Sequence, residues 1–173
     1  MSMRAALLLM VTLLLSACGF HLRGHDLQGK EYPFQSLYLK TPSETPFTTE
    51  LRMQLELNKI VLASSPAQAD LTLEVVAENT NKQIMALSGA GQIREYQLRY
   101  TVSLRAYDRQ QNDWLNADEI VLQRSMTYDD SQILAKEQEE AMIMRDMRAD
   151  AAQQVLRRLA RAKPHPVEHV DKP

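Results

Sequence analysis

The feature that most constrains the fold is a regular alternation of apolar and polar side chains over residues 93–107. A period of two over this length, with β-branched and aromatic residues, predicts one long strand with a buried face and a wet face. The side chains expected on the buried face are Tyr96, Leu98, Tyr100, Val102, Leu104 and Ala106. Those expected on the wet face are Gln97, Arg99, Thr101, Ser103 and Arg105.

Shorter patterns predict further strands around this one. Residues 71–77 alternate in the same way, and residues 119–128 form a third alternating segment. Between residues 71–77 and residues 93–107, residues 87–91 contain two glycines, which permit the positive φ of a hairpin tip. Residues 37–39 predict an earlier strand, and residues 60–62 predict a short strand or the approach to one.

Two segments have helical periodicity. The first covers residues 47–58, and the second is a long helix over residues 131–162. Glutamates lie early in the long helix and arginines late, as the helix dipole favours. The candidate N-caps at the two helix starts are Thr48 or Thr49, and Asp130 or Ser131.

The long helix carries one apolar stripe, which we expect to be buried. Met142 and Leu156 fall away from the stripe, so the helix has either a weakly apolar second side for a partner or two scattered exposed residues. The stripe consists of Ile133, Met144, Met147, Ala151, Val155 and Leu159.

The order of these elements predicts an α+β fold. The economical arrangement is a two-layer sandwich, with two helices packed on one face of a four-stranded, mostly antiparallel sheet. We expect this domain over residues 36–163, with a tether at 18–35 before it and a disordered tail at 164–173 after it.

The first 17 residues have the composition of an export signal. Arg4 precedes an apolar run over residues 5–15, and small residues follow it. The run is too short for a bilayer-spanning helix, which needs about 20 residues. We therefore expect residues 1–17 to be a lipoprotein-type signal peptide.

Cys18 is the only cysteine of the chain. It follows Leu15-Ser16-Ala17, which resembles a bacterial lipobox, and the resemblance implies cleavage before Cys18 and lipidation of its thiol. The alternative, an ordinary signal peptide that happens to be cleaved before a cysteine, leaves this lone thiol unexplained in an exported chain. Because Gly19 follows in place of the Asp that commonly retains lipoproteins at the inner membrane, we expect the outer membrane.

The charge balance and the polar residues exclude several classes of protein. With 20 Lys and Arg against 22 Asp and Glu and no basic block, nucleic acid is not an expected partner. We find no catalytic signature, phosphate loop or metal motif, so we expect neither an enzyme nor a cofactor. His21 and His25 lie four apart but in a glycine-bearing tether, and we expect them, like His165 and His169, to be solvated.

Lys136 has two interpretations. It lies among three glutamates near the start of the long helix, so a solvent-facing pair with Glu140 is the simpler one. Alternatively, Lys136 contacts an anionic ligand, and Arg94 near the hairpin supplies a second cation. Composition alone favours the pair.

Three short stretches resemble the LptE family of lipopolysaccharide-assembly lipoproteins. They are residues 18–23 (Cys-Gly-Phe-His-Leu-Arg), Gly91-Gln92 with Glu95-Tyr96-Gln97, and Leu134-Ala135-Lys136. The order of the predicted elements also matches that family from Cys18 to about Ala162, which is essentially the whole mature domain.

The resemblance implies a non-enzymatic, lipid-anchored protein of the outer membrane. It would form a one-to-one complex with the β-barrel LptD, act as a plug within that barrel, assist its assembly, and bind lipopolysaccharide during insertion into the outer leaflet. The resemblance also implies that Lys136 binds lipopolysaccharide. A second basic residue of the family is replaced by Gly89, and Arg94 is the candidate substitute. The hairpin residues expected near the ligand or the barrel are Ser88, Gly89, Gly91 and Gln92.

Two other functions compete with this one. The runner-up is an auxiliary, periplasm-facing lipoprotein scaffold of a phospholipid or solute transport system, without affinity for lipopolysaccharide. The third is a lipoprotein hydrolase.

Overall fold

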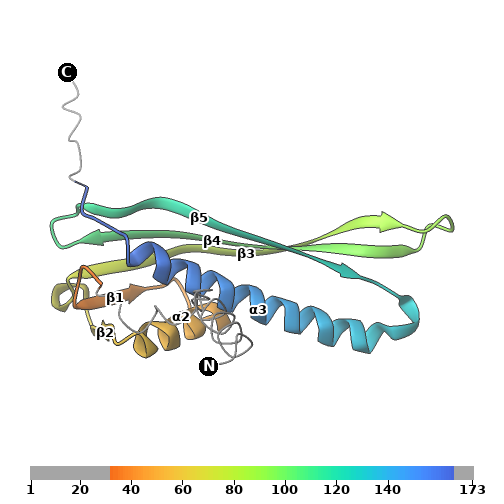
Figure 1. Ribbon diagram of the computed structural model, residues 1–173, viewed down its shortest axis with the longest axis horizontal. Helices are drawn as coiled ribbons and strands as arrows, with labels where there is room; N and C mark the ends of the chain where they lie inside the picture. Colours follow the sequence, from red (N-terminus) through yellow and green to blue (C-terminus); the bar gives the residue numbers. More distant parts are fainter. Residues whose placement is uncertain (1–31, 166–173) are drawn as a thin grey trace, which may run out of the picture. The chain divides into compact units, whose positions relative to one another are not determined.

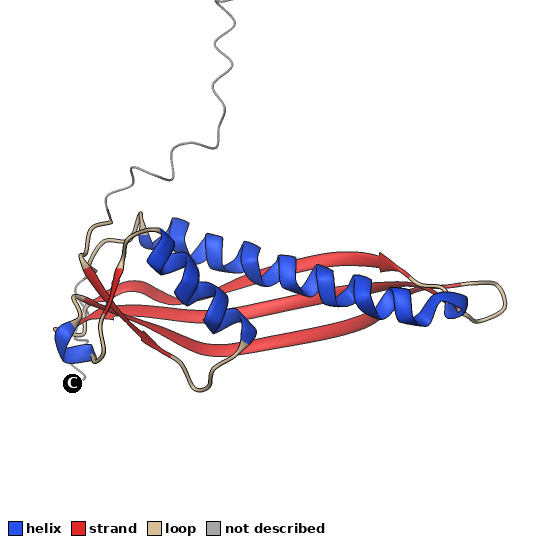
Figure 2. Ribbon diagram, turned by 90° about the horizontal axis from the view of Figure 1, so that it is seen from below, coloured by secondary structure: helices blue, strands red, loops and turns tan. Residues whose placement is uncertain are grey.

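Two helices lie on one face of a five-stranded sheet in the computed structural model, which describes residues 32–165 (Figures 1 and 2). The predicted α+β fold is therefore confirmed. The chain forms, in order, β1 (Ser36–Lys40), α2 (Pro46–Leu57), β2 (Val61–Leu62), η2 (Pro66–Gln68), β3 (Leu71–Leu87), β4 (Ile93–Asp108), β5 (Asp113–Thr127), η3 (Asp130–Gln132) and α3 (Ile133–Leu159).

The strands are arranged in the order β2-β1-β3-β4-β5. The three long strands β3, β4 and β5 are antiparallel, and β1 runs parallel to both of its neighbours. The prediction of four strands was one too few, because Val61 and Leu62 pair with Ser36 and Leu37. That segment becomes a strand through pairing with β1, and it is too short to show a period of its own.

The long strand predicted over residues 93–107 is confirmed as β4, and its apolar side chains from Leu98 to Ala106 are buried. Tyr96, nearer the hairpin, is only half-buried. The neighbouring strands are longer than predicted, since β3 continues to Leu87 and β5 already begins at Asp113. The parts of β3 and β5 that were not predicted also pair with β4. Their sequence does not alternate between apolar and polar residues, because most of their side chains are exposed on both faces of the sheet.

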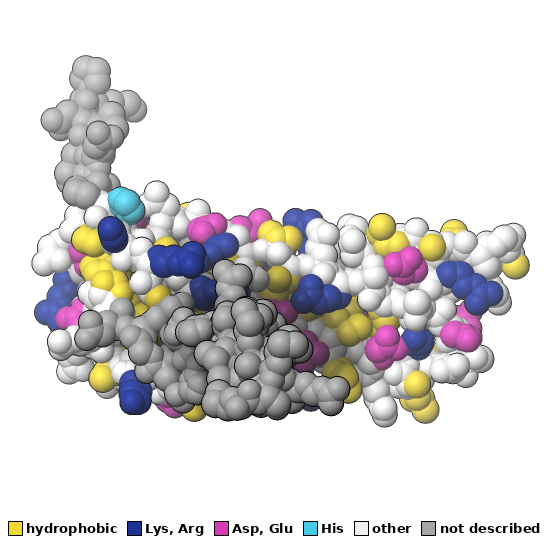
Figure 3. Space-filling view, viewed as in Figure 1, with side chains coloured by type: hydrophobic (Ala, Val, Ile, Leu, Met, Phe, Trp, Pro, Cys, Tyr) yellow, Lys and Arg dark blue, Asp and Glu magenta, His cyan; other side chains and the backbone are white. Residues whose placement is uncertain are grey.

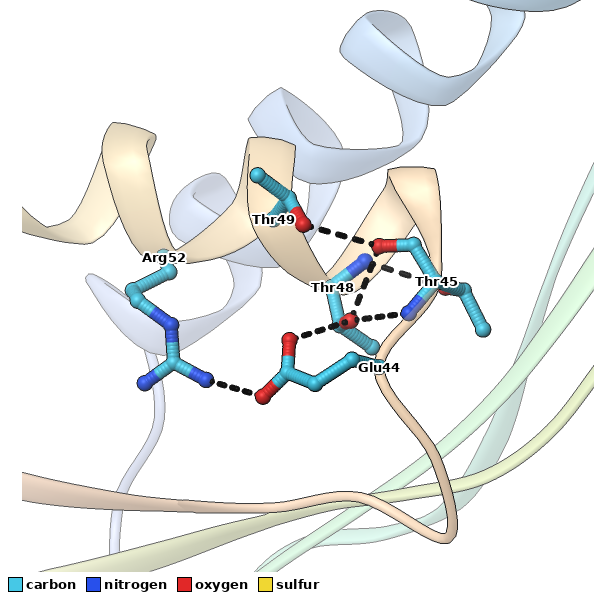
Figure 4. A network of polar contacts seen from close by, with 5 residues as sticks. All are labelled: Glu44, Thr45, Thr48, Thr49 and Arg52. Atoms are coloured by element: carbon cyan, nitrogen blue, oxygen red, sulfur yellow. Dashed lines mark hydrogen bonds and ion pairs between the residues drawn. The ribbon is translucent and has the colours of Figure 1, made fainter.

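The polar network of Figure 4 sets the start of α2. Thr45 is the N-cap: its hydroxyl accepts from the Thr48 amide at 3.2 Å, and the Thr48 hydroxyl accepts from the Thr45 amide at 2.8 Å. Pro46 occupies the first helical position, where its missing N–H costs nothing. The prediction of Thr48 or Thr49 as the cap was therefore wrong, since both lie inside the helix.

The apolar stripe of α3 is buried from Met144 onwards, against both α2 and the sheet. Two details of the prediction were wrong. Ile133 at the helix start is 49% exposed, whereas Leu156, predicted to lie outside the stripe, belongs to the core. Because α3 packs on two elements, its buried stripe is wider than one row of side chains. Met142 does lie outside it, 59% exposed.

Asp70 fastens the start of β1 to the start of β3. Its carboxylate accepts from the backbone amides of Gln35 and Ser36 and from the Ser36 hydroxyl, each at 3.0 Å. The Gln35 amide and the two Ser36 donors lower the pKa of the Asp70 carboxyl.

Candidate functional site

The sequence-predicted site residues gather at one end of the domain. There the tip of the β3–β4 hairpin projects beyond the sheet, and the chain passes from β5 through η3 into α3 (Figure 1). Cys18 and the expected signal peptide lie outside the described residues, as do His21, His25 and His169.

The turn into α3 is built around Asp129. Its carboxylate accepts from the amide of Ser131 at 2.9 Å and from the hydroxyl of the same residue at 2.8 Å. Asp129, rather than the predicted Asp130 or Ser131, therefore caps this turn, because the chain first forms the 3₁₀ turn η3. The N-cap of α3 itself, Gln132, makes no side-chain capping bond.

Lys136, the fourth residue of α3, is held by two acceptors. Its ammonium lies 2.8 Å from the Glu139 carboxylate and 3.2 Å from the Thr127 hydroxyl, and its side chain is only 14% exposed. The predicted pair with Glu140 is wrong: Glu140 pairs instead with Lys82 of β3, at 2.5 Å. The helix thus presents Lys136 to the end of β5.

Arg94 and Lys136 act on the same carboxylate. The Ser131 donors lower the pKa of the Asp129 carboxyl most, and the positive charges of Arg94 and Lys136 lower it further. Arg94 is exposed near the start of β4, and its carbonyl accepts from the Tyr128 amide at 2.9 Å. The fold therefore brings together two cations that lie far apart in the sequence.

An aromatic pair accompanies these charges and was not among the predicted site residues. The rings of Tyr96 and Tyr128 meet edge to face, with centroids 5.1 Å apart, and the Lys82 ammonium lies 4.2 Å from the Tyr96 centroid. The strand alternation predicted Tyr96 on the buried face. Only the pairing of β4 with β3 and β5 brings the two rings and Lys82 together.

The hairpin tip is organised by Ser88. Its hydroxyl accepts from the amides of Ala90 at 3.3 Å and Gln92 at 3.1 Å, and its carbonyl accepts from the Gly91 amide at 2.9 Å. Gly91 has φ of 77°, so the predicted need for glycine is confirmed there. Gly89 does not share this conformation.

This end of the domain is amphipathic and mixed in charge. Figure 3 shows hydrophobic, basic and acidic side chains interspersed there, toward the right of the view. Such a surface offers cations to an anion and apolar side chains to an acyl or alkyl group. The exposed large apolar residues on the segments nearby are Ile84, Met85, Leu87, Ile133, Leu134 and Met142.

Glu78 forms a second polar cluster, between the helices and the sheet, which the sequence did not indicate. It accepts from the Tyr100 hydroxyl at 2.8 Å and from the Thr45 hydroxyl at 2.6 Å. Arg148 of α3 approaches the same carboxylate at 3.9 Å. Burial and the bond to Glu78 raise the pKa of the Tyr100 hydroxyl. The hydroxyl is therefore a neutral donor, and the Glu78 carboxylate that accepts from it is paired with Arg148.

Over residues 32–165, no three His, Cys, Asp or Glu side chains are arranged so that they could hold a metal ion. No helix in that range has the length and apolar content needed to span a bilayer.

Comparisons with known proteins agree on one family. The model of the family described as "LptE: Lipopolysaccharide-assembly" matches residues 34–159. The chain is 29% identical over 157 residues to an LPS-assembly lipoprotein LptE of Yersinia enterocolitica, covering 88% of this chain and 73% of that protein. It is 26% identical over 154 residues to an LPS-assembly lipoprotein LptE of Pectobacterium atrosepticum, covering 87% and 80%.

Solved structures of lipoproteins share the fold. An uncharacterized lipoprotein B from Nitrosomonas europaea aligns with a TM-score of 0.68 at 32% identity, covering 80% of this chain and 88% of that one. A minor lipoprotein from Acinetobacter baumannii aligns with a TM-score of 0.64 at 26% identity, covering 78% and 98%.

Proposed function

The chain belongs to the LptE family of lipopolysaccharide-assembly lipoproteins, and from this premise we propose that it binds lipopolysaccharide and plugs the barrel LptD. The family is non-enzymatic, and its role lies in lipopolysaccharide assembly. The proposed complex with LptD is one-to-one and belongs to the outer membrane. The observation that carries the ligand part is that Lys136 contacts Thr127 at the end of β5, while Arg94 is hydrogen-bonded through its carbonyl to the adjacent Tyr128.

The proposed membrane attachment rests on Cys18. Acyl groups on this residue would hold the domain at the periplasmic leaflet, since each buried CH₂ contributes about 0.8 kcal/mol and stable attachment needs more than one chain. Once the domain lies in a barrel, the acyl groups are no longer its only attachment. Their main role in this proposal is to keep the domain at the membrane while barrel and plug assemble.

In the proposed ligand site, Lys136 pairs with a phosphate or carboxylate of lipopolysaccharide. The site already contains a competing anion, Glu139, so the ligand either displaces this carboxylate or shares the ammonium with it. Because Lys136 is only 14% exposed, its charge is less screened by water than that of a fully exposed lysine. Arg94 supplies the second positive charge.

The open face of the sheet supports the plug. Both helices lie on the opposite face (Figures 1 and 2), which leaves the polar side of β4 uncovered by helices. The lumen of a membrane barrel is polar, and these side chains can form hydrogen bonds with such a wall. They are the predicted wet-face residues Gln97, Arg99, Thr101, Ser103 and Arg105.

The ligand part is tested by measuring the affinity of the purified chain for lipopolysaccharide. Lys136→Gln should weaken binding about tenfold, the effect of losing one charge-assisted hydrogen bond. Glu139→Gln should strengthen it, because the competing carboxylate is gone. Arg157→Gln, an exposed cation late in the same helix, is the control. Equal affinities for the native chain and Lys136→Gln, with both folded, would remove Lys136 from the site.

The partner part is tested by co-purification from detergent-solubilised outer membranes. We expect one large barrel protein per copy of this chain. Recovery of the chain without any barrel protein contradicts the plug and favours the transport scaffold.

A further inference from the structure

The edge of β3 lacks a backbone partner over most of its length. β1 pairs with β3 only from Leu37 opposite Leu71 to Lys40 opposite Glu74 (Figure 1). Beyond that point, β3 runs to Leu87 with β4 as its one partner strand among the described residues. An unpaired strand edge presents a row of backbone donors and acceptors to any strand that can approach it.

The open edge contains one regular segment between two irregular ones. The pairing of β3 with β4 shifts between Val75 and Ala77 and again between Ile84 and Ala86, and it is unbroken from Ala77 to Ile84. Bulges twist a strand and interrupt its pairing. They confine any strand added at this edge to residues 77–84.

That segment is self-complementary about Thr80. If a second copy is laid antiparallel with Thr80 opposite Thr80, then Asn79 faces Asn81 and Glu78 faces Lys82, each twice. Directly opposed side chains lie about 5 Å apart, where opposite charges attract and amides form hydrogen bonds. In any other antiparallel register, Glu78 of one copy no longer lies opposite Lys82 of the other.

We propose that two copies of this chain associate through the β3 edge as an antiparallel, two-fold symmetric pair centred on Thr80. A two-fold interface requires a surface that is complementary to itself, which this edge provides. Glu78 and Lys82 lie on the helix side, where Glu78 contacts Tyr100 and Lys82 contacts Glu140. Charges on an edge strand discourage pairing with strands that lack matching charges, so the same residues make the pairing selective.

The same register supplies an apolar contact. Ile84 of each copy, 53% exposed, comes opposite the bulge at Val76 of the other copy, which is 54% exposed. Beside that bulge lies a pocket of about 370 Å³. It is lined by Pro42, Ser43, Thr45, Pro46, Thr48, Val75, Glu78 and Thr80. The Ile84 side chain of the second copy enters this pocket.

This association is independent of the proposed function. It gives the chain that has not yet met a partner a way to cover its long open edge. Failure of the lipopolysaccharide or barrel experiments leaves it standing, and its own failure leaves those proposals intact.

Disulfide cross-linking of the full chain in detergent tests the pairing. Thr80→Cys should form a symmetric dimer about ten times faster than Gln123→Cys, because only cysteines on facing strands are close enough for a disulfide. Gln123 is exposed on β5, the opposite edge of the sheet. The native chain, whose only cysteine is Cys18, gives the background. Equal rates at the two positions overturn the proposal.

Sedimentation equilibrium gives a second, independent test. Thr80→Glu places two like charges on the symmetry axis and should weaken the dimer about tenfold or more, whereas Gln123→Glu should leave it unchanged. Thr80 is exposed and makes no side-chain hydrogen bond within residues 32–165, so this change spares the fold of the single copy. A native chain that stays monomeric at all concentrations, or a Thr80→Glu variant that dimerises as well as the native chain, contradicts the pairing.

Discussion

The carboxylate of Glu78 accepts a hydrogen bond from the hydroxyl of Tyr100 at 2.8 Å, across two neighbouring strands and beneath the N-terminus of α2. Tyr100 is fully buried, and the Thr45 hydroxyl donates to the same carboxylate. One acidic side chain therefore joins the sheet to the start of a helix. Its partners should make measurable contributions to stability.

Tyr100→Phe should lower the free energy of unfolding by about 1–3 kcal/mol. The change keeps the ring but deprives the Glu78 carboxylate of one of its donors, and an under-satisfied charged group is costly when it is partly buried. Urea denaturation measures the loss. Tyr38→Phe is the control, since Tyr38 makes no side-chain hydrogen bond within the described range. Equal effects of the two substitutions would mean that the bond to Glu78 contributes nothing.

Thr45→Ala should destabilise the domain by about 1–2 kcal/mol, because it removes the N-cap of α2. The matched control is Thr49→Ala, an exposed threonine of the same helix whose loss should cost less than about 0.5 kcal/mol. Thermal or urea unfolding compares them. Because Thr45 and Tyr100 share Glu78, the double variant should depart from additivity. A larger loss for Thr49→Ala would reassign the cap.

Gly91→Ala should destabilise the hairpin by about 1 kcal/mol, since a side chain at φ of 77° is strained whatever the space around it. Gly89→Ala is the internal control. It has no positive φ and no atom within 4 Å of an added methyl group, so its effect should stay within about 0.5 kcal/mol. Hydrogen exchange of the tip amides and unfolding by urea report both variants. Indistinguishable variants would argue against the turn geometry.

The stability contributed by Asp70 should depend on acid pH. Its folded-state pKa is lowered by the donors from Gln35 and Ser36, so the contribution is present above the unfolded-state pKa of about 4 and is lost as pH falls through the lowered value. Because the side chain is 45% exposed, we expect only about 1 kcal/mol at neutral pH. Asp70→Asn should be less stable than the native chain at pH 7, and the gap should close on acidification.

The control for that experiment is Asp146→Asn on α3. Asp146 is exposed and takes part in no hydrogen bond or ion pair within residues 32–165. Its substitution should change the free energy of unfolding at pH 7 by less than about 0.5 kcal/mol. A gap between Asp70→Asn and the native chain that does not change with pH would assign the effect to packing rather than to the charge.

Sequence patterns alone predicted the α+β class, the long strand β4 and most of the buried stripe of α3. The reason is local: alternation in β4 and the 3.6-residue period in α3 each report which face of one element is apolar. The position of the hairpin followed equally well from its glycines. The α2 cap was missed because several threonines near Pro46 have the same local chemistry.

In the candidate site, too, local patterns identified residues but not their contacts. The sequence singled out Lys136 and Arg94, but it could not say that the fold brings them to neighbouring residues of one segment. Lys136 contacts Thr127 and Arg94 bonds to Tyr128 only because β4 pairs with β5 and the chain turns at η3. It also assigned Glu140 to Lys136 from helix spacing. The ion pair of Glu140 with Lys82 exists only because the long helix packs back against the sheet, within reach of the Lys82 side chain from β3.

By itself, the sequence determined the element types and the buried face of β4. The tertiary structure decided the length of β3 and the burial of Leu156. A polar segment becomes a strand when a neighbouring strand supplies hydrogen-bond partners, and a side chain outside the main stripe is buried when another part of the core packs against it. Both outcomes depend on contacts between distant parts of the chain, which no local pattern contains.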